Sequence, residues 1–191
     1  MRCAGGLSVA VLLAMGLSGC ASRPVVGAFL EGLTFRPYES DTTELKGRAT
    51  VFILLDPSCE MVREAAQDHG LLKDLDRSVV NDSTRLVLVG TVSRGQEFSA
   101  EDFRAWVKDN NIRIPFVFDS TRVLARRHRI RRVPWALLTD SHGTLRYSAP
   151  AETMDEGGEY RIQKALYGMR KGVEINPGEP EGDGCALELE K

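Results

Sequence analysis

The stretch FILLDPSCEMV, residues 52–62, decides the fold. Its first half belongs to an apolar, β-branched run, TVFILL at residues 50–55, which is typical of a strand buried on both faces. The DPS triplet that follows supplies turn residues and candidates for a helix N-cap. Apolar spacing then predicts a helix over residues 60–75. Cys59 therefore lies between a buried strand and the first turn of a helix.

The rest of the chain continues this alternation of strands and helices. Ser99 and Asp102 resemble a capping box, which marks the start of one of the helices. The DSHG sequence at residues 140–143 predicts a hairpin turn. Together the patterns predict an α/β fold with a mixed sheet and helices on both faces. Strands are expected at residues 84–92, 115–118, 135–139 and 144–148, and helices at residues 99–110, 120–128 and 160–171.

Three segments resemble the thioredoxin superfamily. FILLDPSCEMV resembles its strand-turn-helix segment with the redox motif, RVPWALLT at residues 132–139 resembles its cis-proline segment, and DSHGTLRY at residues 140–147 resembles the hairpin that follows. The chain is thus similar to bacterial thioredoxin-like, redoxin-domain proteins over about residues 30–172. This resemblance implies a thioredoxin-like fold with a central mixed sheet. It also implies a cis Val133–Pro134 bond, with Pro134 shaping a substrate groove beside Cys59.

The position of Cys59 favours reactivity. Backbone N–H groups and the dipole at a helix N-terminus stabilise a thiolate, which is the nucleophile of thiol–disulfide exchange. The alternative is that Cys59 is a small buried apolar residue. A C-x-x-C motif would place its resolving thiol at position 62, which is Val62. Asp56 is a candidate proton acceptor for Cys59, or else a turn or N-cap residue.

Cys185 is a tentative resolving thiol for Cys59. It lies in the tail of residues 173–191, which is long enough to reach the site at about 3.3 Å per residue. The alternative is that Cys185 is an idle or intermolecular thiol on an acidic, flexible tail. Three functions stay open: thiol–disulfide exchange with protein thiols, a redox-inactive binding module, and a single-cysteine peroxide reductase. The last lacks the P-x-x-x-T-x-x-C pattern of peroxiredoxins.

The N-terminus resembles a bacterial lipoprotein signal peptide. An apolar run at residues 7–18 leads to Leu17-Ser18-Gly19-Cys20, which resembles a lipobox. The resemblance implies cleavage of residues 1–19, acylation of Cys20 and a tether over residues 20–29. It places the domain of residues 30–172 in the bacterial cell envelope, either facing the periplasm, with the outer membrane favoured over the inner, or on the extracytoplasmic surface. Its partners there would be protein thiols and disulfides.

Charge and histidine spacing argue against other classes of function. The 25 Lys and Arg residues nearly balance the 27 Asp and Glu residues, so no global positive field favours nucleic acid. Six arginines and His128 cluster at residues 122–132, where they either approach Cys59 or form a solvated face that pairs with the acidic tail. No metal site is expected, because Cys59 and the histidines lack ligand spacing. No cofactor is expected either.

Overall fold

The computed structural model describes residues 47–67, 70–79, 84–92, 98–178 and 182–187 of the 191-residue chain. The predicted signal peptide, Cys20 and the tether of residues 20–29 lie outside these residues. So does the predicted beginning of the domain at residue 30. The lipidation and the domain boundaries therefore stay predictions from the sequence.

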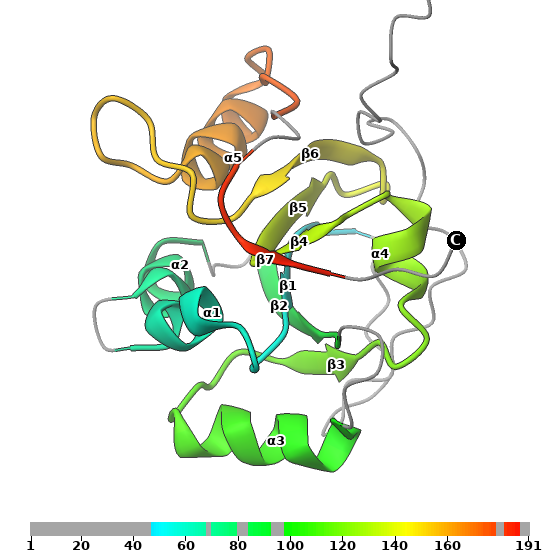
Figure 1. The fold of residues 1–191 in the computed structure, drawn as a ribbon. Helices are drawn as coiled ribbons and strands as arrows, with labels where there is room; N and C mark the ends of the chain where they lie inside the picture. The colour runs from blue at the N-terminus through cyan, green and yellow to red at the C-terminus, as the bar shows by residue number, and fades with distance from the viewer. Residues whose placement is uncertain (1–46, 68–69, 80–83, 93–97, 179–181, 188–191) are drawn as a thin grey trace, which may run out of the picture.

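A five-stranded mixed sheet forms the centre of the molecule, as the sequence predicts (Figure 1). Its strand order is β3-β2-β1-β5-β6. The first three strands in the chain pair in parallel, whereas β5 runs antiparallel to β1, and β6 runs antiparallel to β5. The strands are β1 Ala49–Leu55, β2 Thr84–Gly90, β3 Phe116–Phe118, β5 Trp135–Thr139 and β6 Leu145–Pro150.

Helices flank this sheet. The helices are α1 Glu60–Ala65, α2 Leu71–Val79, α3 Ala100–Asp109, α4 Val123–Arg127 and α5 Arg161–Lys171. In Figure 1, α1, α2 and α5 lie together on one side of the sheet and α4 lies on the other. The Gln163 side-chain amide donates to Ser78 Oγ at 2.7 Å, which joins α5 to α2. The predicted capping box is present, since Ser99 and Asp102 exchange hydrogen bonds at the start of α3.

The single helix predicted over residues 60–75 is wrong, because the chain forms α1 and α2 with a break between them. The break centres on Gly70, whose N–H donates to the carbonyl of Gln67 at 2.9 Å. A Cβ at Gly70 would lie 2.5 Å from the carbonyl oxygen of Ala65. Both helices place apolar residues in the same core, so the apolar spacing continues across the turn and does not reveal the break.

The strand β1 lies at the centre of the core, and every one of its residues is buried. Beside it, the ring of Phe103 from α3 packs against Gly90 at the end of β2. Phe103 also packs edge-to-face against Phe116, with 5.5 Å between the ring centroids. A Cβ at Gly90 would lie 2.7 Å from the Phe103 ring, so a glycine is needed for this close approach. This packing fixes the carboxyl ends of β1 and β2, where the site is built.

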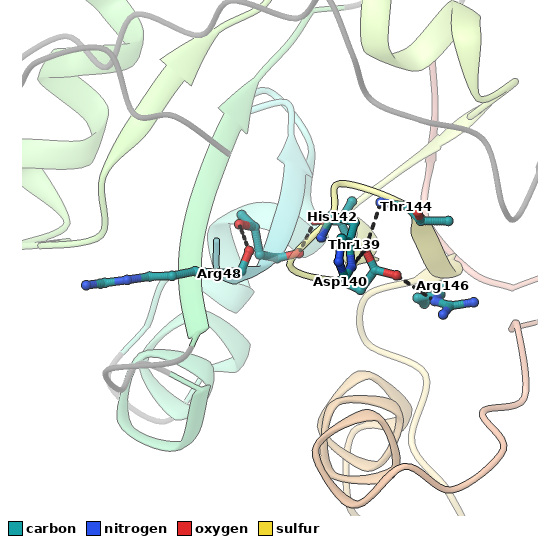
Figure 2. A network of polar contacts seen from close by, with 7 residues as sticks. Arg48, Thr139, Asp140, His142, Thr144 and Arg146 are labelled. Carbon is teal, nitrogen blue, oxygen red and sulfur yellow. Dashed lines mark hydrogen bonds and ion pairs between the residues drawn. The ribbon is translucent and has the colours of Figure 1, made fainter. Parts of the chain in front are cut away.

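The opposite end of the sheet is held by the polar network in Figure 2. Asp140 Oδ1 accepts hydrogen bonds from the N–H groups of His142 and Thr144, at 2.9 and 3.0 Å. Asp140 Oδ2 accepts from Arg146 Nε at 2.9 Å. Thr139 pairs with Thr50 at the beginning of β1, away from Cys59. The network therefore supports the hairpin turn predicted at residues 140–143 and lies at the end of β1 remote from the cysteine.

A second, two-stranded sheet lies beside the site. It pairs β4, Arg132–Val133, antiparallel with β7, Cys185–Ala186 (Figure 1). The tail approaches it along β6, where Ser148 N–H donates to the carbonyl of Pro177 at 2.9 Å. The tail, singled out in the sequence for its glycines, proline and acids, thus supplies a strand to the fold. Across the described residues, no helix is long and apolar enough to cross a membrane.

Candidate functional site

Cys59 caps the N-terminus of α1, directly after the turn that follows β1. Its N–H donates to the carbonyl of Asp56 at 2.9 Å, and its own carbonyl accepts from the N–H of Arg63 at 3.1 Å. Its backbone is extended, with φ −76° and ψ 130°. Only 4% of the residue is exposed. The cysteine thus lies just beyond the carboxyl end of the central strand β1 and at the start of α1, as the sequence predicts.

Asp56 holds the turn that presents Cys59. Its Oδ1 accepts from the N–H of Ser58 at 2.9 Å and from the hydroxyl of Ser58 at 2.7 Å. Asp56 is buried, so this carboxylate needs such donors. These contacts favour the turn role over the alternative of proton acceptor. A proton-accepting role for Asp56 stays a prediction.

Cys59 and Cys185 are joined by a disulfide bond across 126 residues of sequence. The Cα atoms lie 5.8 Å apart, within the usual range for disulfides. Cys185 is half-buried and therefore more accessible than its partner. The structure thus brings together the two thiols that the sequence analysis singled out. Their roles as attacking and resolving thiols remain proposals.

The segment before Pro134 lies against the bonded sulfur. The Val133–Pro134 peptide is cis, and the carbonyl oxygen of Val133 lies 3.7 Å from Cys59 Sγ. The carbonyl of Pro134 accepts from the N–H of Ala151 at 3.1 Å, which ties the segment to the end of β6. The cis Val133–Pro134 bond, beside Cys59, is the one that the family resemblance implies. A role for Pro134 in shaping a substrate groove stays a proposal.

Val62 occupies the position of a resolving thiol in a C-x-x-C motif. It is fully buried on α1, where it packs in the hydrophobic core. The local motif therefore offers an apolar side chain where dithiol proteins carry sulfur. In this chain the second sulfur comes from β7 instead.

Three residues hold Cys185 in place through contacts that were not predicted from the sequence. Gly184 has φ +144°, and a Cβ there would lie 2.8 Å from the carbonyl oxygen of Val133. Arg132 donates from its guanidinium to the carbonyl of Gly184 at 3.0 Å. Leu187 is 3% exposed and joins the core. The sequence feature that could have predicted these contacts is GCAL, residues 184–187, which places a glycine, a cysteine and two apolar residues within an otherwise acidic tail.

Two residues of the basic run at residues 122–132 have different surroundings: Arg132 contacts the tail, and His128 is buried. Arg132 approaches the tail, where its guanidinium donates to the backbone carbonyl of Gly184. Glu179 and Glu181, two of the acids expected to pair with this run, lie outside the described residues. His128 is 1% exposed, and neither ring nitrogen has a hydrogen-bond partner among the described residues. Burial, with the nearby charge of Arg127, lowers the pKa of His128 from 6.5 to about 4. His128 is thus a neutral, buried side chain near neutral pH.

Metal ligands do not cluster in the part of the chain that the structure describes. No group of three or more His, Cys, Asp and Glu side chains there could hold a metal ion. The chemistry that Cys59 and Cys185 offer is that of their two bonded sulfurs.

Sequence comparisons give no relative. No protein-family model matches the chain, and no curated protein does. The fold, by contrast, has many solved counterparts.

Three of these structures illustrate the likeness. An uncharacterized conserved protein from Geobacillus kaustophilus is 14% identical with a TM-score of 0.66, covering 86% of this chain and 92% of its own. A thioredoxin-like protein solved in its oxidized form is 18% identical with a TM-score of 0.55, covering 80% and 98%. A thiol-disulfide isomerase from Corynebacterium glutamicum is 15% identical with a TM-score of 0.57, covering 78% and 97%.

These likenesses extend over most of both chains. Identities of this size establish architecture, and the chemistry must be argued from the site itself. The chain has the thioredoxin-like fold.

Proposed function

We propose that the protein carries out thiol–disulfide exchange with protein thiols, with Cys59 as the attacking thiol and Cys185 as the resolving thiol. The observation that carries the proposal is the disulfide between a cysteine at the start of α1 and a cysteine on the tail strand β7. A disulfide that only stabilises the fold does not need to lie at the start of this helix. This one joins the cysteine after the carboxyl end of β1 to Cys185, which pairs with the segment before Pro134 and is partly accessible.

The exchange uses the two sulfurs in order. In the dithiol form, the Cys59 thiolate attacks a disulfide of a partner protein, forms a mixed disulfide with one partner sulfur and releases the other as a thiolate. Cys185 then attacks the Cys59 sulfur, which frees the second partner thiol and restores the bond seen here. One disulfide is consumed and one is formed, so the partner gains the two electrons that the protein loses.

Trapping variants test this order. Reduced wild-type protein is expected to reduce the disulfides of a model protein such as insulin, whereas Cys59→Ser abolishes the reaction. Cys185→Ser is expected to accumulate a mixed disulfide at Cys59, identified by peptide mass spectrometry without reducing agent. The control is the double variant Cys59→Ser/Cys185→Ser, which shows the background from other thiols. If wild type and Cys59→Ser react equally slowly, the fold serves as a redox-inactive binding module.

We also propose that the protein acts in the bacterial cell envelope, anchored by lipid on Cys20. Sequence resemblance supports this location, through the lipobox ending at Cys20 and the apolar run before it. A bond between Cys59 and Cys185 also suits an oxidising compartment. Expression of the wild type should yield a membrane-bound form carrying fatty acid such as palmitate, and Cys20→Ser should yield an unmodified form. Equal masses and equal membrane association in the two would refute the anchor.

A further inference from the structure

The tail strand β7 is held on the edge of β4 by both backbone and side-chain contacts. Val133 is the register partner of Cys185, and Arg132 is the register partner of Ala186. The N–H of Leu187 donates to the carbonyl of Arg131 at 2.7 Å. From the other direction, the Arg132 guanidinium donates to the carbonyl of Gly184 at 3.0 Å. The short edge thus binds an extended segment of four residues as a ligand would be bound.

The contacts are selective at three of the four positions. At Gly184 a Cβ would lie 2.8 Å from the Val133 carbonyl oxygen, so the position before the cysteine has no room for a side chain. Cys185 supplies the sulfur that bonds to Cys59. Leu187 is 3% exposed and packs in the core, so the position two residues after the cysteine enters an apolar site. Ala186 is exposed and leaves its position unspecified.

We propose that the β4 edge recognises an extended Gly-Cys-X-Leu segment of a partner protein, and that β7 is the chain's own version of this ligand. The proposal rests on the proposed function and adds its specificity. Main-chain pairing with an exposed strand gives affinity, and pockets for particular side chains give selectivity. A partner segment that enters in this register places its cysteine sulfur where Cys185 now lies, within bonding reach of Cys59.

Because β7 and the partner segment use the same β4 edge, formation of the mixed disulfide is coupled to its resolution. In the dithiol form β7 leaves the edge, the partner segment pairs with β4, and Cys59 forms the mixed disulfide described above. When Cys185 attacks Cys59, β7 competes for the same backbone groups of Arg131 and Arg132. Return of β7 therefore breaks the mixed disulfide and displaces the partner segment in one event, with the partner cysteine leaving as a thiolate.

The test is the rate at which Cys59 attacks a set of matched peptides. The probe is the hexapeptide Gly-Asp-Gly-Cys-Ala-Leu of residues 182–187, with its cysteine joined to thionitrobenzoate as a chromogenic leaving group. The protein carries Cys185→Ser, which removes the covalent bond that holds β7 at Cys59 and lets the peptide compete for the β4 edge. The same series with reduced wild-type protein keeps the test valid if the variant folds poorly. Cys59→Ser/Cys185→Ser supplies the background rate.

The expected result is discrimination at two positions of the peptide and none at the third. Peptides carrying Gly184→Ala or Leu187→Ser should react at least about fivefold more slowly than the parent, because backbone strain or loss of an apolar contact costs that much or more. The peptide carrying Ala186→Lys should react within twofold of the parent, because its side chain points to solvent.

Each other outcome has a definite meaning. Equal rates for all four peptides, alongside normal attack on a small aromatic disulfide, would overturn the specificity while leaving the exchange function intact. Failure to attack any disulfide would overturn the proposed function itself. A disulfide-linked dimer of the oxidised wild type, with Cys59 of one copy joined to Cys185 of another, would show that the occupant is a second copy of this chain, and would overturn the partner assignment.

Discussion

Replacing Gly184 by alanine provides a direct measure of how tightly β7 is held. In the oxidised form this residue has φ +144°, a conformation that is nearly restricted to glycine. The added methyl group would lie 2.8 Å from the Val133 carbonyl oxygen and 3.3 Å from Arg132 Cβ. Backbone strain of this kind costs about 1–3 kcal/mol. The Val133 carbonyl has little freedom to move, because it also lies 3.7 Å from Cys59 Sγ.

The strain falls on the disulfide form alone if β7 leaves β4 in the dithiol form. The oxidised-to-reduced ratio of Gly184→Ala should then fall by about 5- to 150-fold, because 1.4 kcal/mol is a factor of ten. For a two-electron couple this raises the reduction potential by about 20–60 mV. Wild type and variant are equilibrated in glutathione buffers, quenched in acid and alkylated with a maleimide reagent that shifts gel mobility. The oxidised fraction then gives the ratio directly.

Gly158 is a matched control for this measurement. It also has a positive φ, +78°, but a Cβ there would meet nothing within 4 Å. Gly158→Ala should therefore destabilise both redox forms equally and leave the ratio unchanged. An unchanged ratio in Gly184→Ala as well would refute the reasoning, because it would mean that β7 is held identically with and without the bond.

Three further perturbations test stability. The disulfide closes a loop of 126 residues, so the free energy of unfolding in urea should be about 5 kcal/mol higher for oxidised wild type than for Cys185→Ser. A difference under 1 kcal/mol would contradict the pairing. The pKa of His128 is lowered from 6.5 to about 4, so the unfolded chain binds the proton first as the solution is acidified. The contribution of His128 to the free energy of unfolding is therefore fully present above pH 6.5, and up to about 3 kcal/mol is lost as the pH falls towards 4. Unfolding measured against pH should lack this slope in His128→Leu. Gly90→Ala would place a methyl group 2.7 Å from the ring of Phe103, at a cost of about 1–3 kcal/mol. A double-mutant cycle with Phe103→Leu should recover part of that loss, and strict additivity would show that the ring is not the obstacle.

Much of the fold could be predicted from the sequence because its strands carry a strong local signal. The apolar run of β1 reads as a strand buried on both faces, and the DPS turn after it locates the cysteine at the start of a helix. The hairpin turn at Asp140 and the capping box at Ser99 are equally local. Each of these features depends on neighbouring residues only.

The features that could not be predicted depend on contacts between distant residues. The break before Gly70 arises because its backbone packs against the carbonyl of Ala65, which apolar spacing does not register. The pairing of β7 with β4 joins residues more than fifty positions apart, through only two register pairs. Arg132 was noted for its charge, yet the contact that it makes is a hydrogen bond to a glycine carbonyl. Composition marked the tail as acidic, and only the structure shows that Leu187 anchors it in the core.

The bond between Cys59 and Cys185 also makes most of the described polypeptide a covalent ring. Residues 60–184 lie inside this ring, including α1 to α5 and the strands β2 to β6. A single protease cut in any loop within it leaves the oxidised molecule in one piece, because the two fragments remain joined through sulfur. The same cut in the reduced molecule leaves two chains that only packing holds together. Oxidised protein should therefore tolerate nicking that releases fragments from the reduced form, so the redox state determines what a protease can remove.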